Sequence, residues 1–125
     1  MEGYRELLAV ARRDNGLADF GDTSFMEGLE VLVTSLNAEA HLNAAGEKAL
    51  RDTILRYLRQ RLEVEEWYRL HPETAESTIL RPLFGVSLPR TGSTALSFLL
   101  ASDPGVRYLR MWESFQPFPP PSTVS

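Results

Sequence analysis

Residues 89–94 bring together the groups that a protein needs to bind a phosphate-like anion; they are Pro89, Arg90, Thr91, Gly92, Ser93 and Thr94. Gly92 gives the backbone freedom to turn and leaves room for an anion to approach the main chain. If a helix follows, its first N–H groups and its dipole attract negative charge. Arg90 adds a permanent positive charge, and the hydroxyls of Ser93 and Thr94 can cap the helix or bind phosphate oxygens. The turn is therefore predicted to hold an anion.

The loop does not match the nucleotide-binding motif Gly-x-x-x-x-Gly-Lys-Ser/Thr. Gly85 and Gly92 are too far apart for that motif, and no Lys follows Gly92. This argues against an ordinary ATPase or GTPase and makes a kinase-like nucleotide binder the weakest hypothesis. Two simpler interpretations stay open, because a Gly-Ser-Thr turn is most often only a turn and Arg90 could form a surface ion pair.

The segments on either side of the loop predict a β-loop-α-β unit. Residues 82–88 form a short apolar run bounded by prolines, which suits a buried strand better than a helix. Residues 95–100 predict a helix, and residues 106–109 predict a second strand. One such unit cannot form a sheet with both faces covered. The expected fold class is α/β, with a helical N-terminal region followed by the first β-loop-α-β unit of a parallel sheet, in a chain that is incomplete.

Ahead of this unit, the apolar residues recur at helical spacing. They predict helices over residues 3–13, from Ser24 to about residue 36, and over about residues 44–70. The predicted domains are a helical region, 1–80, and a second region, 81–125, which holds the loop at 89–95 and a proline-rich tail. The signals that should start or stop the helices are Asn15-Gly16, Asn43 and His71-Pro72.

Composition and charge exclude several classes of function. The 125 residues are 43% hydrophobic with a net charge of −4, which is ordinary for a globular domain and unfavourable for non-specific nucleic-acid binding. Residues 81–125 hold four Arg against two acids, whereas residues 1–80 are strongly acidic, so the positive excess lies near the loop. There is no cysteine, and the two His residues lack partners at metal-ligand spacing, so no metal site is predicted. The absence of a signal or membrane-spanning stretch makes the cytoplasm the expected location, without a membrane partner.

The residues from Pro89 to Leu96 resemble the phosphosulfate-binding loop of the sulfotransferases, Pro-Lys/Arg-Ser/Thr-Gly-Thr/Ser-Thr. The resemblance is strongest over residues 70–121 and covers the N-terminal portion of such an enzyme. The flanking residues are similar to a bacterial-type branch in which a helical region precedes the loop; they are His71–Glu73, Arg81–Phe84, Leu99–Pro104, Met111–Glu113, Pro117 and Pro119–Pro121.

This resemblance implies a P-loop-like parallel-sheet fold and 3′-phosphoadenosine 5′-phosphosulfate (PAPS) as co-substrate, with transfer of its sulfuryl group to a hydroxyl or amine of a small-molecule acceptor. Arg90 would stabilise charge on the leaving phosphate, since an arginine does not readily donate a proton. Glu113 would be the general base, although a surface carboxylate is the alternative. The donor-binding residues implied by the resemblance are Arg90, Thr91, Gly92, Ser93, Thr94 and Ala95.

Two hypotheses of different class remain. The chain is either a partial sulfotransferase with negligible activity by itself, because the family's contacts to the 3′-phosphate come from later segments, or a helical interaction module with a relic phosphate loop. Self-association through the helical region belongs to the second hypothesis.

Overall fold

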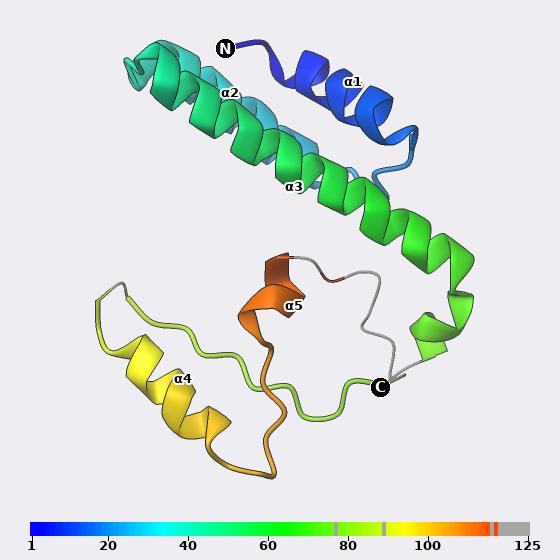
Figure 1. Cartoon of the computed structure of the whole chain (residues 1–125), viewed down its shortest axis with the longest axis vertical. Coiled ribbons are helices and arrows are strands. Elements are labelled where there is room, and N and C mark those ends of the chain that lie inside the picture. The colour runs from blue at the N-terminus through cyan, green and yellow to red at the C-terminus, as the bar shows by residue number, and fades with distance from the viewer. Residues whose placement is uncertain (77, 89, 116, 118–125) are drawn as a thin grey trace. The chain divides into compact units, whose positions relative to one another are not determined.

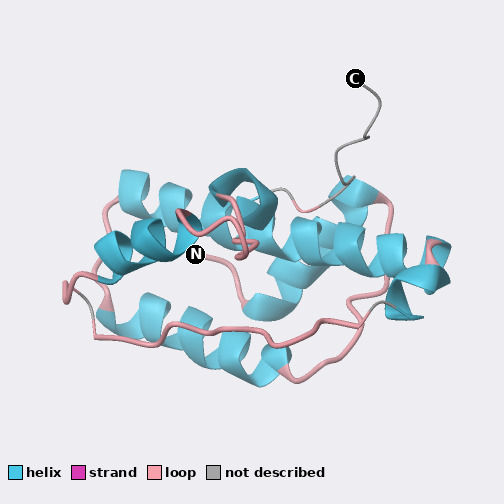
Figure 2. Ribbon diagram, turned by 90° about the horizontal axis from the view of Figure 1, so that it is seen from below, coloured by secondary structure: helices cyan, strands magenta, loops and turns pink. Residues whose placement is uncertain are grey.

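The computed structural model describes residues 1–76, 78–88, 90–115 and 117. The chain divides into two compact units, Met1–Pro72 and Glu73–Ser125. Figures 1 and 2 show that helices and loops make up the described residues of both units.

The first unit contains three α-helices: α1 (Tyr4–Asn15), α2 (Phe25–Glu39) and α3 (Ala44–Leu70). Helix α1 packs along α3 and also contacts α2 (Figure 1). The three predicted helices are confirmed, because their apolar residues at helical spacing meet in one core. The buried residues of that core are Leu7, Leu8, Ala11, Phe20, Val33, Ile54, Leu55, Leu58 and Leu62.

The ends of these helices follow local signals in the sequence. Gly16 ends α1 with φ +67°, and its N–H donates to the Arg12 carbonyl at 2.9 Å. Such a left-handed residue after the last turn is usually glycine. At the start of α3, the Asn43 side chain accepts a hydrogen bond from the Gly46 N–H at 2.8 Å, as a helix cap does. The predicted signals at Gly16 and Asn43 are therefore confirmed.

The turn between α1 and α2 is held by two arginines. Arg61 of α3 donates to the carbonyl oxygens of Phe20 at 2.7 Å and Asp22 at 2.8 Å. Arg12 of α1 donates to the Ala18 carbonyl at 3.1 Å and lies over the Phe20 ring. These contacts give the carbonyl groups of an irregular segment the partners that its own backbone does not supply.

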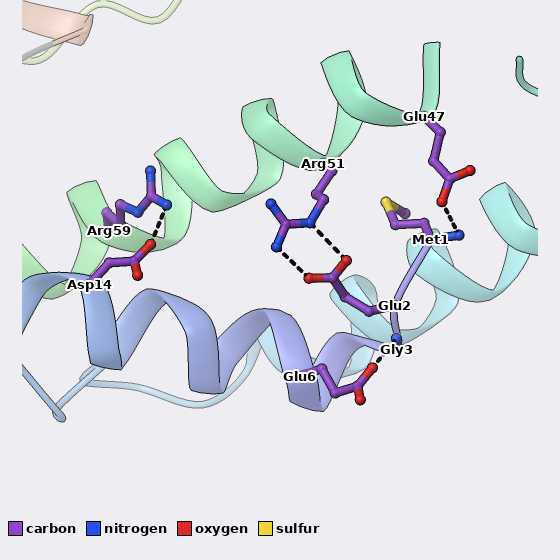
Figure 3. A network of polar contacts seen from close by, with 8 residues as sticks. All are labelled: Met1, Glu2, Gly3, Glu6, Asp14, Glu47, Arg51 and Arg59. Carbon is purple, nitrogen blue, oxygen red and sulfur yellow. Dashed lines mark hydrogen bonds and ion pairs between the residues drawn. The ribbon is translucent and has the colours of Figure 1, made fainter. Parts of the chain in front are cut away.

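Ion pairs join the N-terminal residues and α1 to α3, as Figure 3 shows. The α-amino group of Met1 pairs with Glu47, and the Met1 side chain is 2% exposed. At the other end of α1, Asp14 pairs with Arg59. Together with the core, these pairs fix α1 on α3 at both of its ends.

The second unit contains η1 (Pro72–Glu76, whose first residue closes the first unit), α4 (Ser93–Ala101) and α5 (Met111–Phe115). The predicted helix after the loop is confirmed by α4. No helix in the described part of the chain has both the length and the apolar character needed to cross a membrane.

The predicted β-loop-α-β unit is wrong for the residues that the structure describes. Residues 82–88 and 106–109 are loops, and no magenta segment appears in Figure 2. A strand exists only through ladder hydrogen bonds to a neighbour, and no bond joins these two described segments. Strands of a parallel sheet are also buried on both faces, whereas Phe84 is 81% and Val86 94% exposed. The apolar run is real, but the described residues contain nothing that pairs with it or covers it.

Candidate anion-binding loop

The loop reaches helix α4 through two residues with left-handed backbone. Arg90 has φ +66° and Gly92 has φ +89°. Nothing lies within 4 Å of where a Cβ on Gly92 would stand, so the space beside its main chain is open, as expected for an anion cradle. A left-handed conformation costs a residue with a Cβ about 1–2 kcal/mol, so Arg90 is strained where Gly92 is not. Pro89, the first residue of the predicted loop, lies outside the described residues.

One side-chain hydrogen bond holds the loop. The Thr91 hydroxyl donates to the Leu88 carbonyl at 2.6 Å. An intramolecular hydrogen bond of this kind contributes about 0.5–1.5 kcal/mol, which is of the same size as the strain at Arg90. The sequence suggested hydroxyl roles for Ser93 and Thr94 only, and this bond of Thr91 was not expected.

The N-terminus of α4 presents unpaired amides. Gly92 is the residue that precedes the first helical turn, and no side chain caps it. The predicted cap by Ser93 or Thr94 is therefore wrong. The first turn closes when the Leu96 N–H donates to the Gly92 carbonyl at 3.1 Å. Among the described residues, the N–H groups of 93–95 have no acceptor, which leaves them free for an anion.

Arg90 is exposed, and its guanidinium has no partner within the residues that the structure describes. The interpretation of Arg90 as a surface ion-pair residue therefore finds no support there. The side chains of Ser93 and Thr94 are also exposed, and no bond of either hydroxyl occurs within the described ranges. Amides, hydroxyls and one positive charge are thus available on a stretch of six residues, 90–95.

Glu113 has two partners of its own. Its carboxylate accepts a hydrogen bond from the Arg110 N–H at 2.6 Å and one from Arg107 Nη2 at 2.8 Å. Its side chain is 18% exposed, against 75% for that of Arg107. A Glu at the third position of a helix that bonds back to the residue before the helix is half of a capping box. That spacing, with Arg110 just before a short helix and Glu113 in its first turn, is the signal that sequence reasoning missed.

The structure does not bring Glu113 to the loop. Helices α4 and α5 make no contact with each other, and no hydrogen bond or ion pair joins Glu113 to residues 90–95 within the described part of the chain. The two residues predicted as catalytic, Arg90 and Glu113, therefore stand apart within this unit.

No group of three or more His, Asp or Glu side chains that could hold a metal ion occurs among the residues described. Two shallow hollows in the first unit contain none of the predicted site residues; one is lined by Leu17, Asp19, Leu62, Glu65 and Arg69, the other by Glu2, Glu6, Val10 and Arg13.

The chain superposes on two solved sulfotransferase structures. The first, sulfotransferase STF9 from Mycobacterium avium, is 31% identical with a TM-score of 0.85, over 96% of this chain and 31% of that one. The second, sulfotransferase STF1 from Mycobacterium tuberculosis H37Rv, is 38% identical with a TM-score of 0.83, over 94% of this chain and 33% of that one. The chain thus spans about a third of the length of these two proteins.

No protein-family model matches the chain, and no curated protein does. The resemblance to bacterial sulfotransferases nevertheless extends over almost the whole of this chain and is confirmed.

Proposed function

We propose that this chain, which resembles mycobacterial sulfotransferases over almost its whole length, binds the sulfate donor PAPS through residues 90–95 and takes part in sulfuryl transfer. One observation carries the proposal. The unpaired amides of residues 93–95, in the first turn of α4, lie within a few residues of Arg90, whose guanidinium has no partner among the described residues. A donor with a phosphosulfate group offers the oxygens that such groups bind.

In the proposed reaction, an acceptor oxygen or nitrogen attacks the sulfur of the donor. The bond between that sulfur and the bridging oxygen breaks, and the electron pair stays on the phosphate that leaves. As in phosphoryl transfer, positioning and charge stabilisation then do most of the work. The amides of residues 93–95 hold the anion in place, and Arg90 neutralises charge on the leaving phosphate. Arg90 does not act as a proton donor, because a guanidinium stays protonated.

Glu113 is the proposed acceptor of the proton that the attacking group loses. Its two partners, the Arg110 N–H and Arg107, orient the carboxylate. Each carboxylate oxygen has two lone pairs, so both oxygens keep capacity for a further proton or hydrogen bond. For this proton transfer, the attacking oxygen or nitrogen of the small-molecule acceptor must lie beside Glu113. A small-molecule acceptor and a cytoplasmic location belong to the proposal on the sequence grounds given above.

Titration calorimetry tests donor binding. The ligand is PAPS, or its desulfated product adenosine 3′,5′-bisphosphate. Arg90→Ala should weaken binding about tenfold or more, since charge-assisted hydrogen bonds to phosphate are strong. Arg81→Ala is a matched control, because Arg81 is also exposed and also has positive φ, +52°. Binding that survives Arg90→Ala, or that falls equally in both variants, rejects the loop as the donor site.

A second candidate function is that of a helical interaction module. It is favoured by apolar side chains on the outer face of α2, where Val31 is 61% and Leu32 47% exposed. Size-exclusion chromatography with light scattering separates the two. A defined oligomer that Val31→Glu dissociates, together with no donor binding, favours the module; a monomer that binds the donor excludes it.

A further inference from the structure

Thr91 lies between the two loop residues that have left-handed backbone. Those residues, Arg90 and Gly92, both have positive φ, whereas Thr91 itself does not. Its hydroxyl reaches back to the Leu88 carbonyl at 2.6 Å, across the start of the loop. No other side chain of residues 90–92 forms a hydrogen bond within the residues that the structure describes. The bond therefore spans Arg90 without involving its side chain.

A left-handed arginine is uncommon and needs something to hold it. Without the bond to Leu88, Arg90 could relax to negative φ, which would change the direction in which its side chain leaves the loop. The other residue at positive φ, Gly92, needs no such support because it lacks a Cβ. The strain thus lies on Arg90, and the bond that offsets it comes from the next residue.

We propose that Thr91 is a positioning residue whose hydroxyl, bonded to the Leu88 carbonyl, holds Arg90 in the conformation that receives the donor. The inference rests on the proposed function of the loop, but assigns the hydroxyl a different role from the amides. The Thr91 hydroxyl acts on the backbone of the loop and does not contact the donor. The hydroxyls of Ser93 and Thr94, which have no partner in the described structure, keep the role of possible donor contacts.

The test compares Thr91→Val with Thr91→Ser. Valine keeps the size and branching of threonine but has no hydroxyl, whereas serine keeps the hydroxyl. Thr53→Val is the matched control, because the Thr53 hydroxyl also donates to a carbonyl, that of Ala49 at 2.8 Å, but on α3 of the first unit. The affinity for adenosine 3′,5′-bisphosphate is measured by titration calorimetry. The one-bond Cα–Hα coupling of Arg90, which distinguishes positive from negative φ, is measured by NMR without ligand.

We expect Thr91→Val to weaken binding about two- to tenfold, the range that one lost hydrogen bond gives. Its Arg90 coupling should shift toward the value for negative φ. Thr91→Ser should restore both measurements, and Thr53→Val should change neither. The serine rescue separates the hydroxyl from a general effect of altered packing.

The outcomes distinguish this inference from the function on which it rests. Unchanged binding in Thr91→Val, with binding lost in Arg90→Ala, overturns the positioning role and leaves the donor site standing. Weaker binding with an unchanged Arg90 coupling also overturns it, because the hydroxyl would then contact the ligand directly. If the parent chain binds no donor, the proposed function fails, and an Arg90 coupling unchanged in Thr91→Val overturns the positioning role by itself.

Discussion

Glu2 and Arg51 form a two-pronged ion pair that joins the chain ahead of α1 to α3. Nε of Arg51 lies 2.7 Å from Oε2 of Glu2, and Nη2 lies 2.7 Å from Oε1 (Figure 3). The side chain of Arg51 is 33% exposed and that of Glu2 is 24% exposed, so solvent screens the pair only in part. Two parallel bonds also fix the geometry better than a single contact does. The hydrogen bonds from Arg51 lower the pKa of Glu2 below its ordinary value of 4.5.

The lowered pKa makes stability depend on pH. Because the folded state favours ionised Glu2, its contribution is complete above the ordinary pKa and is lost as the pH falls through the folded value. Glu2→Gln should therefore lower the free energy of unfolding by about 1 kcal/mol at pH 7 and by much less near pH 2. Urea unfolding at the two pH values measures this. Glu30→Gln, on the exposed side of α2, is the control, and an equal loss at both pH values contradicts the linkage.

Lysine should be a poor replacement for Arg61 of α3. Arg61 donates through Nε and Nη2 to two carbonyls, those of Phe20 and Asp22, and lies 4.4 Å from the centre of the Phe25 ring. Lysine cannot reproduce this fork. We expect Arg61→Lys to destabilise the first unit by about 1–2 kcal/mol in thermal or urea unfolding. Arg13→Lys, an exposed change at the end of α1, should have little effect; similar losses in both would reject the role of the fork.

The core should depend strongly on Leu62. This side chain is 0% exposed. Leu62→Ala removes buried methyl groups and leaves a cavity, which costs about 2–5 kcal/mol. Leu70→Ala on the same helix is the comparison, since Leu70 is 56% exposed and should cost well under 1 kcal/mol. Chemical denaturation gives both values, and a small loss for Leu62→Ala would mean that the core around α1 and α3 is not packed as described.

Capping and proton transfer by Glu113 can be separated. Glutamine at this position can still accept the Arg110 N–H bond, whereas alanine cannot. The Cα chemical shifts of α5 should therefore stay helical in Glu113→Gln and move toward coil in Glu113→Ala. In any assay where the chain transfers the sulfuryl group, Glu113→Gln should abolish transfer without weakening donor binding. Transfer that persists in Glu113→Gln and is lost only in Glu113→Ala would make Glu113 a cap and not a base.

Local signals in the sequence were sufficient for α1, α2, α3 and α4, but the short helices η1 and α5 were not predicted. The cap at Asn43 and the stop at Gly16 depend on residues next to the helix end, so a single sequence reveals them. The loop was recognisable for the same reason, because its chemistry lies in consecutive residues.

Structural features that depend on residues far apart in the sequence were not predicted. A strand at 82–88 requires a neighbour elsewhere in the chain, and the periodicity of an apolar run does not show whether one is present. The hydrogen bond between Arg61 and Phe20 joins residues that are 41 positions apart in the sequence. Arg107, which donates to Glu113, lies six residues before it, which is not one of the helical spacings that sequence patterns report. Left-handed backbone at Arg90 was also unexpected, since that conformation normally signals glycine.

The exposed apolar run at 82–88 has a charge at each end, Arg81 and Arg90. Short apolar segments without charge favour association between chains, and flanking charges oppose that association. The arginine that is proposed to receive the donor therefore also stands where a charge opposes association of the run. Arg81→Ala and Arg90→Ala each remove one of these two charges, so a difference in donor affinity between the two variants does not arise from net charge.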